Sequence, residues 1–410
     1  MTGRAHAFWS RADCGVAVPR QEPDQRGSLC DSPPEMRKIW QLATREGAHR
    51  SIWSGICSGS FPKGALLHRP VPHPDNPRWG LSRGLRVDRL GRVRQHGQPV
   101  SNLQDILGGS PALVFVNPLA GGGRAGRHLL RVRQAFEAEK IPAEFALTAT
   151  AKDLESRARS AIADGRHLLM AMGGDGTLQG LANAAYGSDV LLGVLPAGGG
   201  NDFAAALGLP KDLVAAIHAM VNGQPREVDL LRARTSDGCQ RLYVGGGGVG
   251  LDVDASVHAA GIYRWLPGRL RYVASAVQAW LEFTQLNVRA EFPGSEEAMM
   301  QESVLLAGVL NAPSYGAGLR VAPDARVDDG WLNLSFVKSL GTREVLALLP
   351  RLLIGGTLPD AYLKQKQSRR VLLRTDRPCF FHGDGEILGP APVEIEVVPR
   401  AVKMLAPRTR

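Results

Sequence analysis

Apolar residues recur along the chain with two different periods, and each period occupies its own part of the sequence. Between Pro111 and about residue 226, short apolar runs alternate with segments whose apolar residues are three or four positions apart. The runs predict buried strands and the segments predict helices. The strands are expected at Ala112–Val116, Glu144–Thr148, 167–172 and 190–196, with helices that include Asp153–Ala163 and Leu213–Val221. This alternation is typical of a parallel sheet covered by helices.

From Val228 onward most segments have the period-2 pattern of strands, and helices are expected only at about Gly268–Phe283 and Arg343–Ile354. A series of strands with few helices predicts a mostly antiparallel domain. The predicted fold class is therefore α/β plus β. A parallel α/β nucleotide-binding domain at 109–226 is followed by an antiparallel β-sandwich domain at 227–405, and the last strand, Val393–Val398, fits either domain.

Residues 1–108 hold no apolar period for long, apart from a possible short helix at Glu35–Glu46. Pro, Gly, Arg and Ser recur throughout this segment. Such a composition predicts a disordered or loosely folded extension. A chain that starts near Gln104 is therefore expected to keep the fold and the activity.

Composition and charge exclude several protein classes. Hydrophobic residues make up 44% and charged residues 21% of the 410 residues, as in soluble globular proteins. No run of about 18–20 apolar residues predicts a membrane span, and the start of the chain lacks the apolar segment of a signal peptide. Most of the net charge of +10 lies in the first 110 residues, where prolines and acids dilute the basic residues, so no nucleic-acid partner is expected. We expect a cytoplasmic protein.

Three Gly-rich turns follow apolar strands and precede helices in the α/β part: Asn117–Gly123, Gly173–Thr177 and Pro196–Asp202. In an open parallel sheet, ligands bind at the carboxyl ends of the strands. Glycine lets backbone N–H groups approach phosphate oxygens there, and helix N-termini favour negative charge. Three such turns predict a ligand that carries phosphate. None of them has the spacing of a P-loop or of a Rossmann dinucleotide turn.

Two acidic turns lie in the β part. Gly383–Glu386 (GDGE) places two carboxylates two residues apart, and Val327–Leu332 (VDDGWL) has a similar composition. A carboxylate in such a turn can accept a hydroxyl proton or ligate Mg²⁺. An Asp-Gly pair is also a frequent plain hairpin turn, so this pattern leaves both interpretations open.

The motifs NPxAG, GGDGT, PxGxxNDFA, APxAxxDDGxL and DGE occur in that order. Together they closely resemble the diacylglycerol kinase catalytic-domain family, which includes bacterial soluble lipid kinases and is related to sphingosine, ceramide and NAD kinases. The resemblance covers about residues 111–405. It implies an ATP-dependent kinase that phosphorylates a lipid hydroxyl. Diacylglycerol, a sphingoid base, phosphatidylglycerol and an undecaprenyl-like alcohol all remain possible acceptors.

The resemblance also implies roles for individual residues. Asp384 would be the catalytic base with Glu386 as its acidic neighbour, and Asp384→Asn is expected to lower turnover at a nearly unchanged melting temperature. Asp329 would ligate a structural Mg²⁺ together with the backbone carbonyls of Arg326 and Trp331. The nucleotide would be bound by Asn117, Gly121, Thr148, Gly173, Gly174, Asp175, Gly176, Thr177, Gly198, Gly200, Asn201 and Asp202.

The chain departs from the family pattern at four positions. Gln179 and Gly180 replace the Asn and Glu of GGDGTxNE, Gly199 replaces a threonine, and Gly245 stands where an asparagine is usual. These changes predict weakened ATP binding. A catalytically weakened nucleotide- or lipid-binding homologue is therefore one alternative, and a NAD kinase-like enzyme is another.

One stretch, Tyr263–Leu286, mixes arginines with tyrosine and tryptophan. That mixture suits the headgroup layer of a membrane, and it is equally consistent with a helix that packs on the β domain. The corresponding expectation is transient contact with the inner face of the membrane.

Overall fold

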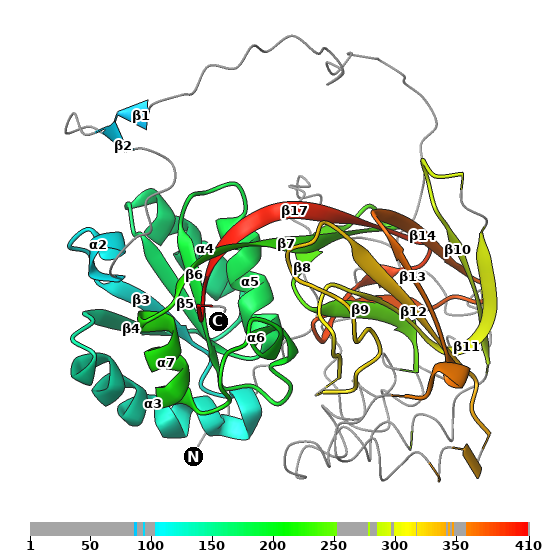
Figure 1. Ribbon diagram of the computed structural model, residues 1–410, viewed down its shortest axis with the longest axis horizontal. Helices are drawn as coiled ribbons and strands as arrows, with labels where there is room; N and C mark the ends of the chain where they lie inside the picture. The colour runs from blue at the N-terminus through cyan, green and yellow to red at the C-terminus, as the bar shows by residue number, and fades with distance from the viewer. Residues whose placement is uncertain are drawn as a thin grey trace, which may run out of the picture. The chain divides into compact units, whose positions relative to one another are not determined.

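The computed structural model describes residues 103–251, 278, 285–296, 299–316, 318–341, 343–344, 347 and 358–408, and the backbone of 86–87 and 93–94. Two short strands, β1 (Arg86–Val87) and β2 (Val93–Arg94), pair antiparallel and are set apart from the rest of the described chain. The rest of the described chain forms one unit with an α/β part and a β part (Figure 1).

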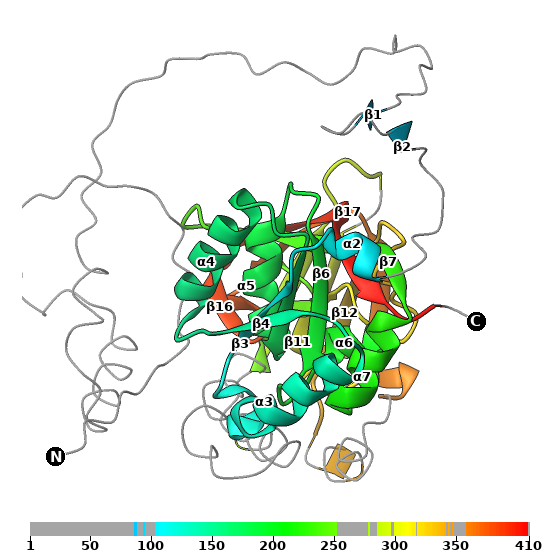
Figure 2. The ribbon, with the colours of Figure 1, turned by 90° about the vertical axis from the view of Figure 1, so that its left-hand side faces the viewer.

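The α/β part is built on a parallel sheet with the spatial order β6-β5-β3-β4. Helices lie on both sides of this sheet, with α4 and α5 on one side and α3 and α7 on the other (Figure 2). The strands are β3 (Ala112–Val116), β4 (Ala143–Leu147), β5 (Leu168–Gly173) and β6 (Leu191–Pro196). The helices are α2 (Leu103–Leu107), α3 (Ala120–Ala138), α4 (Ala151–Ala163), α5 (Asp175–Ala185), α6 (Asp202–Ala206) and α7 (Leu213–Val221).

Local sequence explains where these elements form. Every residue of β5 and β6 is buried, and such continuous apolar runs are typical of a parallel sheet covered on both faces. Helix α4 begins where the Thr150 side chain accepts a hydrogen bond from Asp153 N, and α7 begins where Asp212 accepts from Val214 N and Ala215 N. Both are N-caps, which satisfy backbone donors that a helix start leaves unpaired.

The β part is mostly antiparallel and has a hydrophobic core of its own, which includes Tyr243, Phe336 and Phe381. One 3₁₀ helix, η2 (Asp360–Tyr362), precedes β13. The strands are β7 (Gln224–Thr235), β8 (Gln240–Tyr243), β9 (Gly246–Gly250), β10 (Leu286–Glu291), β11 (Met300–Leu310), β12 (Leu332–Lys338), β13 (Leu363–Ser368), β14 (Arg370–Thr375), β15 (Phe380–Gly383), β16 (Glu386–Pro390) and β17 (Val393–Ala406). The fold class predicted from the sequence is confirmed.

Two long strands join the parts. β7 and β17 pair antiparallel along most of their length, and the end of β17 also pairs parallel with β6, through Lys403↔Leu191 and Met404↔Leu192. In Figure 1 both strands run across the molecule from one part to the other. The sequence pattern did not decide to which domain the last strand belongs. In the structure, this strand, β17, pairs with strands of both parts.

Some elements differ from the sequence expectation. Helix α2 lies within the segment expected to be an extension, yet Leu103 and Leu107 are buried in the core of the α/β part, at 5% and 2% exposure. The packed core therefore begins before residue 109. The helices expected at Glu35–Glu46, Gly268–Phe283 and Arg343–Ile354 lie outside the described residues, or almost entirely so.

Candidate active site

The first Gly-rich loop follows β3 and turns sharply before the regular part of α3. Gly121, Gly122 and Gly123 all have positive φ, between 60° and 83°. A Cβ on Gly121 would lie 2.3 Å from the Ala197 carbonyl oxygen, so only glycine fits this close approach. Asn117 accepts a hydrogen bond from Leu119 N, which shapes the start of the loop.

The third Gly-rich loop packs directly on the second. Asn201 closes this loop because its side chain both accepts from Gly198 N, at 2.8 Å, and donates to Gly198 O. A Cβ on Gly198 would lie 2.4 Å from Gly174 Cα. The two loops thus form one surface of closely spaced backbone at the carboxyl ends of β5 and β6.

Asp175 joins these loops from the start of α5. Its carboxylate accepts hydrogen bonds from Asp202 N and Phe203 N, both at 3.1 Å, at the beginning of α6. Burial, followed by the neighbouring Asp202 carboxylate, raises the pKa of Asp175 above its ordinary value. Ser314, from the β part, donates to Asp202 Oδ1 at 2.7 Å, so this carboxylate also links the two parts.

The acidic turn Gly383–Glu386 joins β15 and β16. It is a hairpin turn, and it also carries buried carboxylates. Asp384 and Gly385 have φ of 51° and 85°, which identifies a two-residue hairpin turn with both central residues left-handed. The Asp384 carboxylate accepts from Val244 N at 2.6 Å, Gly245 N at 2.8 Å and Gly246 N at 3.3 Å. Burial and the nearby Asp175 charge nevertheless raise the pKa of Asp384 to about 8.

Glu386 begins β16 on the other side of this turn. Its side chain is buried, and no described residue hydrogen-bonds to its Oε2. Burial raises the pKa of Glu386 to about 7, while the Arg241 charge lowers it and the Glu155 charge raises it further. A carboxyl group that titrates near neutral pH can take up a proton during a reaction.

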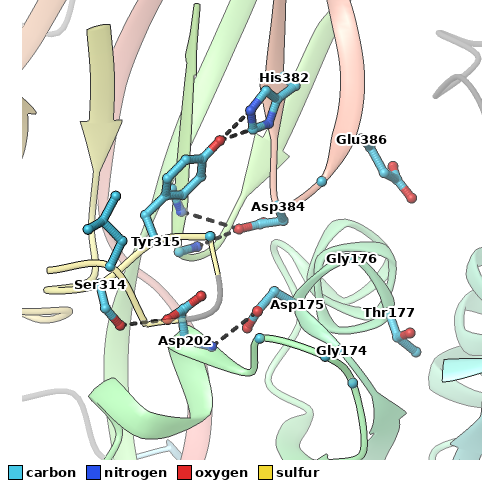
Figure 3. Close-up of a pocket in the computed structure, with 18 of the residues that line it drawn as sticks. Gly174, Asp175, Gly176, Thr177, Asp202, Ser314, Tyr315, His382, Asp384 and Glu386 are labelled. Carbon is cyan, nitrogen blue, oxygen red and sulfur yellow. Dashed lines mark hydrogen bonds between the residues drawn. The ribbon is translucent and has the colours of Figure 1, made fainter. Parts of the chain in front are cut away.

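These features meet in one cavity of about 470 Å³, a size typical of small-molecule sites (Figure 3). The α/β part contributes the Gly-rich loops. The β part contributes the acidic turn and a second wall that includes Leu306, Tyr315, Leu319 and His382. Tyr315 is hydrogen-bonded to His382 Nε2 and their rings stack at 17°. The cavity therefore has a polar side formed by the Gly-rich loops and a more apolar side, together with several carboxylates.

Most of the residues predicted to bind nucleotide or to act in catalysis line this cavity, and three of them, Thr148, Gly173 and Asn201, do not. The lining includes Asn117, Gly121, Gly174, Asp175, Gly176, Thr177, Gly198, Gly200, Asp202, Asp384 and Glu386. Gly173 and Asn201 support the loops from behind. Thr148 is buried, and its hydroxyl donates to Val116 O at 3.1 Å, in the strand end beside the first loop.

Sequence reasoning missed Ser314, Tyr315 and His382. His382 stands two residues before Asp384, and this i, i+2 spacing along a strand was the available pattern. Ser314 and Tyr315 lie in a loop after β11, far from the acidic turn in sequence, and only the fold brings them to the cavity.

Arg326, Asp329 and Trp331 lie apart from the cavity, in a loop beside the buried Asp229. Burial raises the pKa of Asp329, and the Asp229 and Asp328 charges act in the same direction. Among the described residues, no group of three or more His, Cys, Asp or Glu side chains is arranged for a metal. Carboxylate and backbone carbonyl oxygens are of the kind that ligate Mg²⁺, and a cation would relieve the repulsion between these carboxylates.

Comparison with known proteins shows to which family the chain belongs. Residues 111–233 match the diacylglycerol kinase catalytic domain, and 247–406 match the YegS C-terminal NAD kinase beta sandwich-like domain. A protein of Xanthomonas euvesicatoria named "Probable lipid kinase YegS-like" is 32% identical over 62% of this chain and 84% of its own length. The chain belongs to the diacylglycerol kinase catalytic-domain family.

Other members of the family are similar over most of the chain. A diacylglycerol kinase of Mycobacterium tuberculosis is 29% identical over 296 residues, 72% of this chain and 94% of that protein. The crystal structure of a diacylglycerol kinase from Bacillus anthracis superposes with a TM-score of 0.54 at 20% identity, and covers 72% of this chain and 96% of that one. The latter comparison shows the shared fold. In the described part of the present chain, no helix is both long and apolar enough to span a membrane.

Proposed function

We propose that this protein is an ATP-dependent lipid kinase that transfers the γ-phosphoryl group of ATP to a lipid hydroxyl. One observation carries the proposal: the Gly-rich loops of the α/β part and the acidic turn Gly383–Glu386 of the β part face the same cavity. A phosphoryl donor held by the first can thus meet an acceptor held beside the second.

The Gly-rich loops are suited to hold the phosphates of ATP. Backbone N–H groups of the loops and the N-terminus of α5 would bind phosphate oxygens, because both carry partial positive charge. Gly199 also lines the cavity, and its lack of a side chain leaves binding at this position to the backbone.

The opposite wall is suited to a lipid acceptor. Leu251, Leu306 and Leu319 offer apolar surface, and the Tyr315–His382 pair offers polar groups on the same wall. A diacylglycerol or a sphingoid-type lipid has the corresponding chemistry, a hydroxyl next to long apolar chains. Such a substrate implies work at a membrane surface, and we place the enzyme in the cytoplasm, peripheral to the inner face of the membrane. The stretch expected to contact the membrane, Tyr263–Leu286, lies almost entirely outside the described residues.

The chemical step needs a proton acceptor close to the attacking hydroxyl. The hydroxyl oxygen forms a bond to the γ-phosphorus, the bond to the β,γ-bridging oxygen breaks, and ADP leaves. The hydroxyl proton passes to a carboxylate, and we assign this role to Asp384 with Glu386 as the acidic neighbour. Their pKa values near 8 and 7 suit a base that works at neutral pH.

A divalent ion has two places in this proposal. Mg²⁺ bound with ATP would neutralise the charge that develops on the phosphates. A structural Mg²⁺ would be held by Asp329 and the backbone carbonyls of Arg326 and Trp331, where it would stabilise the loop beside Asp229.

The decisive experiment is a kinase assay with γ-labelled ATP, Mg²⁺ and separate lipid acceptors in mixed micelles, with NAD as an additional acceptor. Label in a lipid phosphate supports the proposal, and label in NADP would instead establish the NAD kinase-like alternative. ATP binding by calorimetry without transfer to any acceptor would favour the weakened homologue.

A further inference from the structure

Behind the acidic turn lies a buried ion pair that the roles above do not use. Glu155 from α4 and Arg241 from β8 form a salt bridge, and each side chain is only 11% exposed. Arg159, whose side chain is 59% exposed, reaches Glu155 from the surface at 3.4 Å. Burying two charges is costly unless their position serves the fold or the site.

This pair lies close to Glu386, because Glu386 and Glu155 lie beside successive turns of α5: Glu386 Oε1 is 3.8 Å from the Cβ position of Gly176, and Glu155 Oε1 is 3.8 Å from that of Gly180. Arg241 stabilises the ionised form of Glu386, and Glu155 opposes it. Arg241 Nε and Glu386 Oε2 are also buried atoms for which the described residues provide no hydrogen-bond partner. A donor and an acceptor that do not bond directly can still be joined through a bridging water.

Two other described neighbours of Glu386 are Gly176 and Asp384, and we assign the control of its charge to neither of them. From α5, the Cβ position of Gly176 lies 3.8 Å from Glu386 Oε1 and brings no charge. Asp384, in the same turn, has its carboxylate bonded to the backbone of Val244–Gly246.

The backbone of position 180 lies directly beside the Glu155 carboxylate. A Cβ on Gly180 would lie 3.8 Å from Glu155 Oε1 and 3.4 Å from Leu154 Cδ2. The motif GGDGTxNE would place a glutamate on α5 at this position, and here a carboxylate arrives in the same space from α4.

We propose that Glu155 and Arg241 are positioning residues that hold Glu386 and set its charge, and that Glu155 supplies from α4 the carboxylate that position 180 lacks. The proposal rests on the proposed kinase function for its link to turnover. The polar contacts of the pair are with each other and with Arg159, and none of them is with the three Gly-rich loops, so the pair acts through Glu386.

The first test measures the titration of Glu386 in the full-length protein. Carbon-13 NMR of protein labelled at the glutamate carboxyls follows it, with Glu386→Gln to identify the resonance. Glu155→Gln leaves the Arg241 charge uncompensated, so the midpoint should fall by about half a pH unit or more. Arg241→Gln should raise the midpoint. If this single variant fails to fold, the double variant Glu155→Gln/Arg241→Gln removes both charges. Glu144→Gln, in the more exposed pair with Arg166, is the matched control and should leave the midpoint unchanged.

The second test moves the carboxylate. Gly180→Glu alone places a second carboxylate against Glu155 and should lower turnover and melting temperature. In the Glu155→Ala background the same substitution should restore both toward the wild type. Gly180→Ala reports the effect of filling the helix position without charge.

These outcomes separate the two proposals. If the acid limb of the pH–rate profile moves with the NMR midpoint in Glu155→Gln, the positioning role is supported. An unmoved midpoint in both single variants, or a failure of Gly180→Glu to rescue Glu155→Ala, overturns it. If the midpoint moves as expected while no lipid accepts phosphate, the pair controls Glu386 and the kinase function is what fails.

Discussion

At the scale of single residues, Asp384 combines the proposed role of catalytic base with a structural role. Its left-handed backbone forms the hairpin turn, and its carboxylate binds three backbone N–H groups of the Val244–Gly246 segment. Gly245 belongs to this arrangement, because a Cβ there would lie 3.2 Å from Asp384 Oδ1. The glycine that departs from the family pattern thus allows the close contact.

Asp384→Asn should lower both turnover and stability. Loss of the base should reduce turnover by roughly 10²–10⁴-fold. Asparagine has one acceptor oxygen, so its NH₂ group would face a backbone donor and leave it unpaired, at a cost of about 1–3 kcal/mol. Sequence alone predicts an unchanged melting temperature, and the three contacts reverse that expectation. Thermal unfolding and a kinase assay check both, with the exposed Asp164→Asn as control; an unaltered melting temperature would show that the contacts contribute little.

Glu386→Gln should change how stability depends on pH. The carboxyl group titrates near 4.5 when exposed and at about 7 in the folded protein. As pH rises through this window, the unfolded state ionises first, so the wild type loses stability that it has fully below pH 4.5. The variant lacks this loss, and its melting temperature should gain on the wild type between pH 4.5 and 7. Parallel curves for the two proteins would contradict the raised pKa.

At the scale of elements, the pairing of the long strands β7 and β17 depends on the buried carboxylate of Asp229. Asp229 is 1% exposed and accepts from Gly330 N and Arg400 N, both at 2.7 Å. The register of the two strands shifts between Val398 and Val402, and Arg400 has a φ of 50° there. Asp229 therefore connects the strand irregularity with the loop that carries Asp329.

Asp229→Asn should destabilise the protein without a direct effect on the cavity. One of the two backbone donors loses its acceptor, which costs about 1–3 kcal/mol and lowers the melting temperature by several degrees. ATP affinity, measured by calorimetry below the transition, should stay close to the wild type. A large loss of ATP affinity would mean that the pairing of β7 and β17 also sets the geometry of the phosphate loops.

Tyr315, in the loop after β11, pairs with His382 of β15 on the side of the cavity that we propose for the lipid. Tyr315→Phe keeps the ring and removes the bond to the buried His382, so we expect turnover on the lipid to fall by about 2- to 10-fold. The KM for ATP should not change, because the phosphate loops lie on the other wall. Tyr186→Phe, which removes a hydroxyl bonded to Arg232 at the surface, is the matched control. Equal effects on ATP and lipid would place Tyr315 outside the acceptor site.

At the scale of the whole molecule, α2 is the first described element of the α/β part. A chain that starts at Pro99 should keep stability and activity, since Leu103 and Leu107 remain in the core. A chain that starts at Gly109 removes two buried leucines and should lose several kcal/mol of stability. A start at Gln104, which the sequence predicts to be harmless, removes Leu103 and should lie between them. Unfolding of the three proteins by urea ranks them; equal midpoints would show that α2 is dispensable.

The sequence by itself determined what depends on local pattern. Strands such as Ala112–Val116 and the helix Leu213–Val221 agree with prediction to the residue, because period and capping act over a few neighbours. The order of the motifs was enough to indicate the family. Glycine and acid composition also located the loops that line the cavity, since only certain residues allow such turns.

Tertiary structure decided what depends on residues distant in sequence. That Asp384 is bound by backbone N–H groups 138 to 140 positions away, and that Tyr315 meets His382, follows from strand pairing that no local period encodes. The compensation of Gly180 by Glu155 is of the same kind: the sequence shows only a missing carboxylate, while the packing of α4 against α5 brings another to that space. Raised pKa values likewise arise from burial and neighbouring charge, which exist only once the chain has folded.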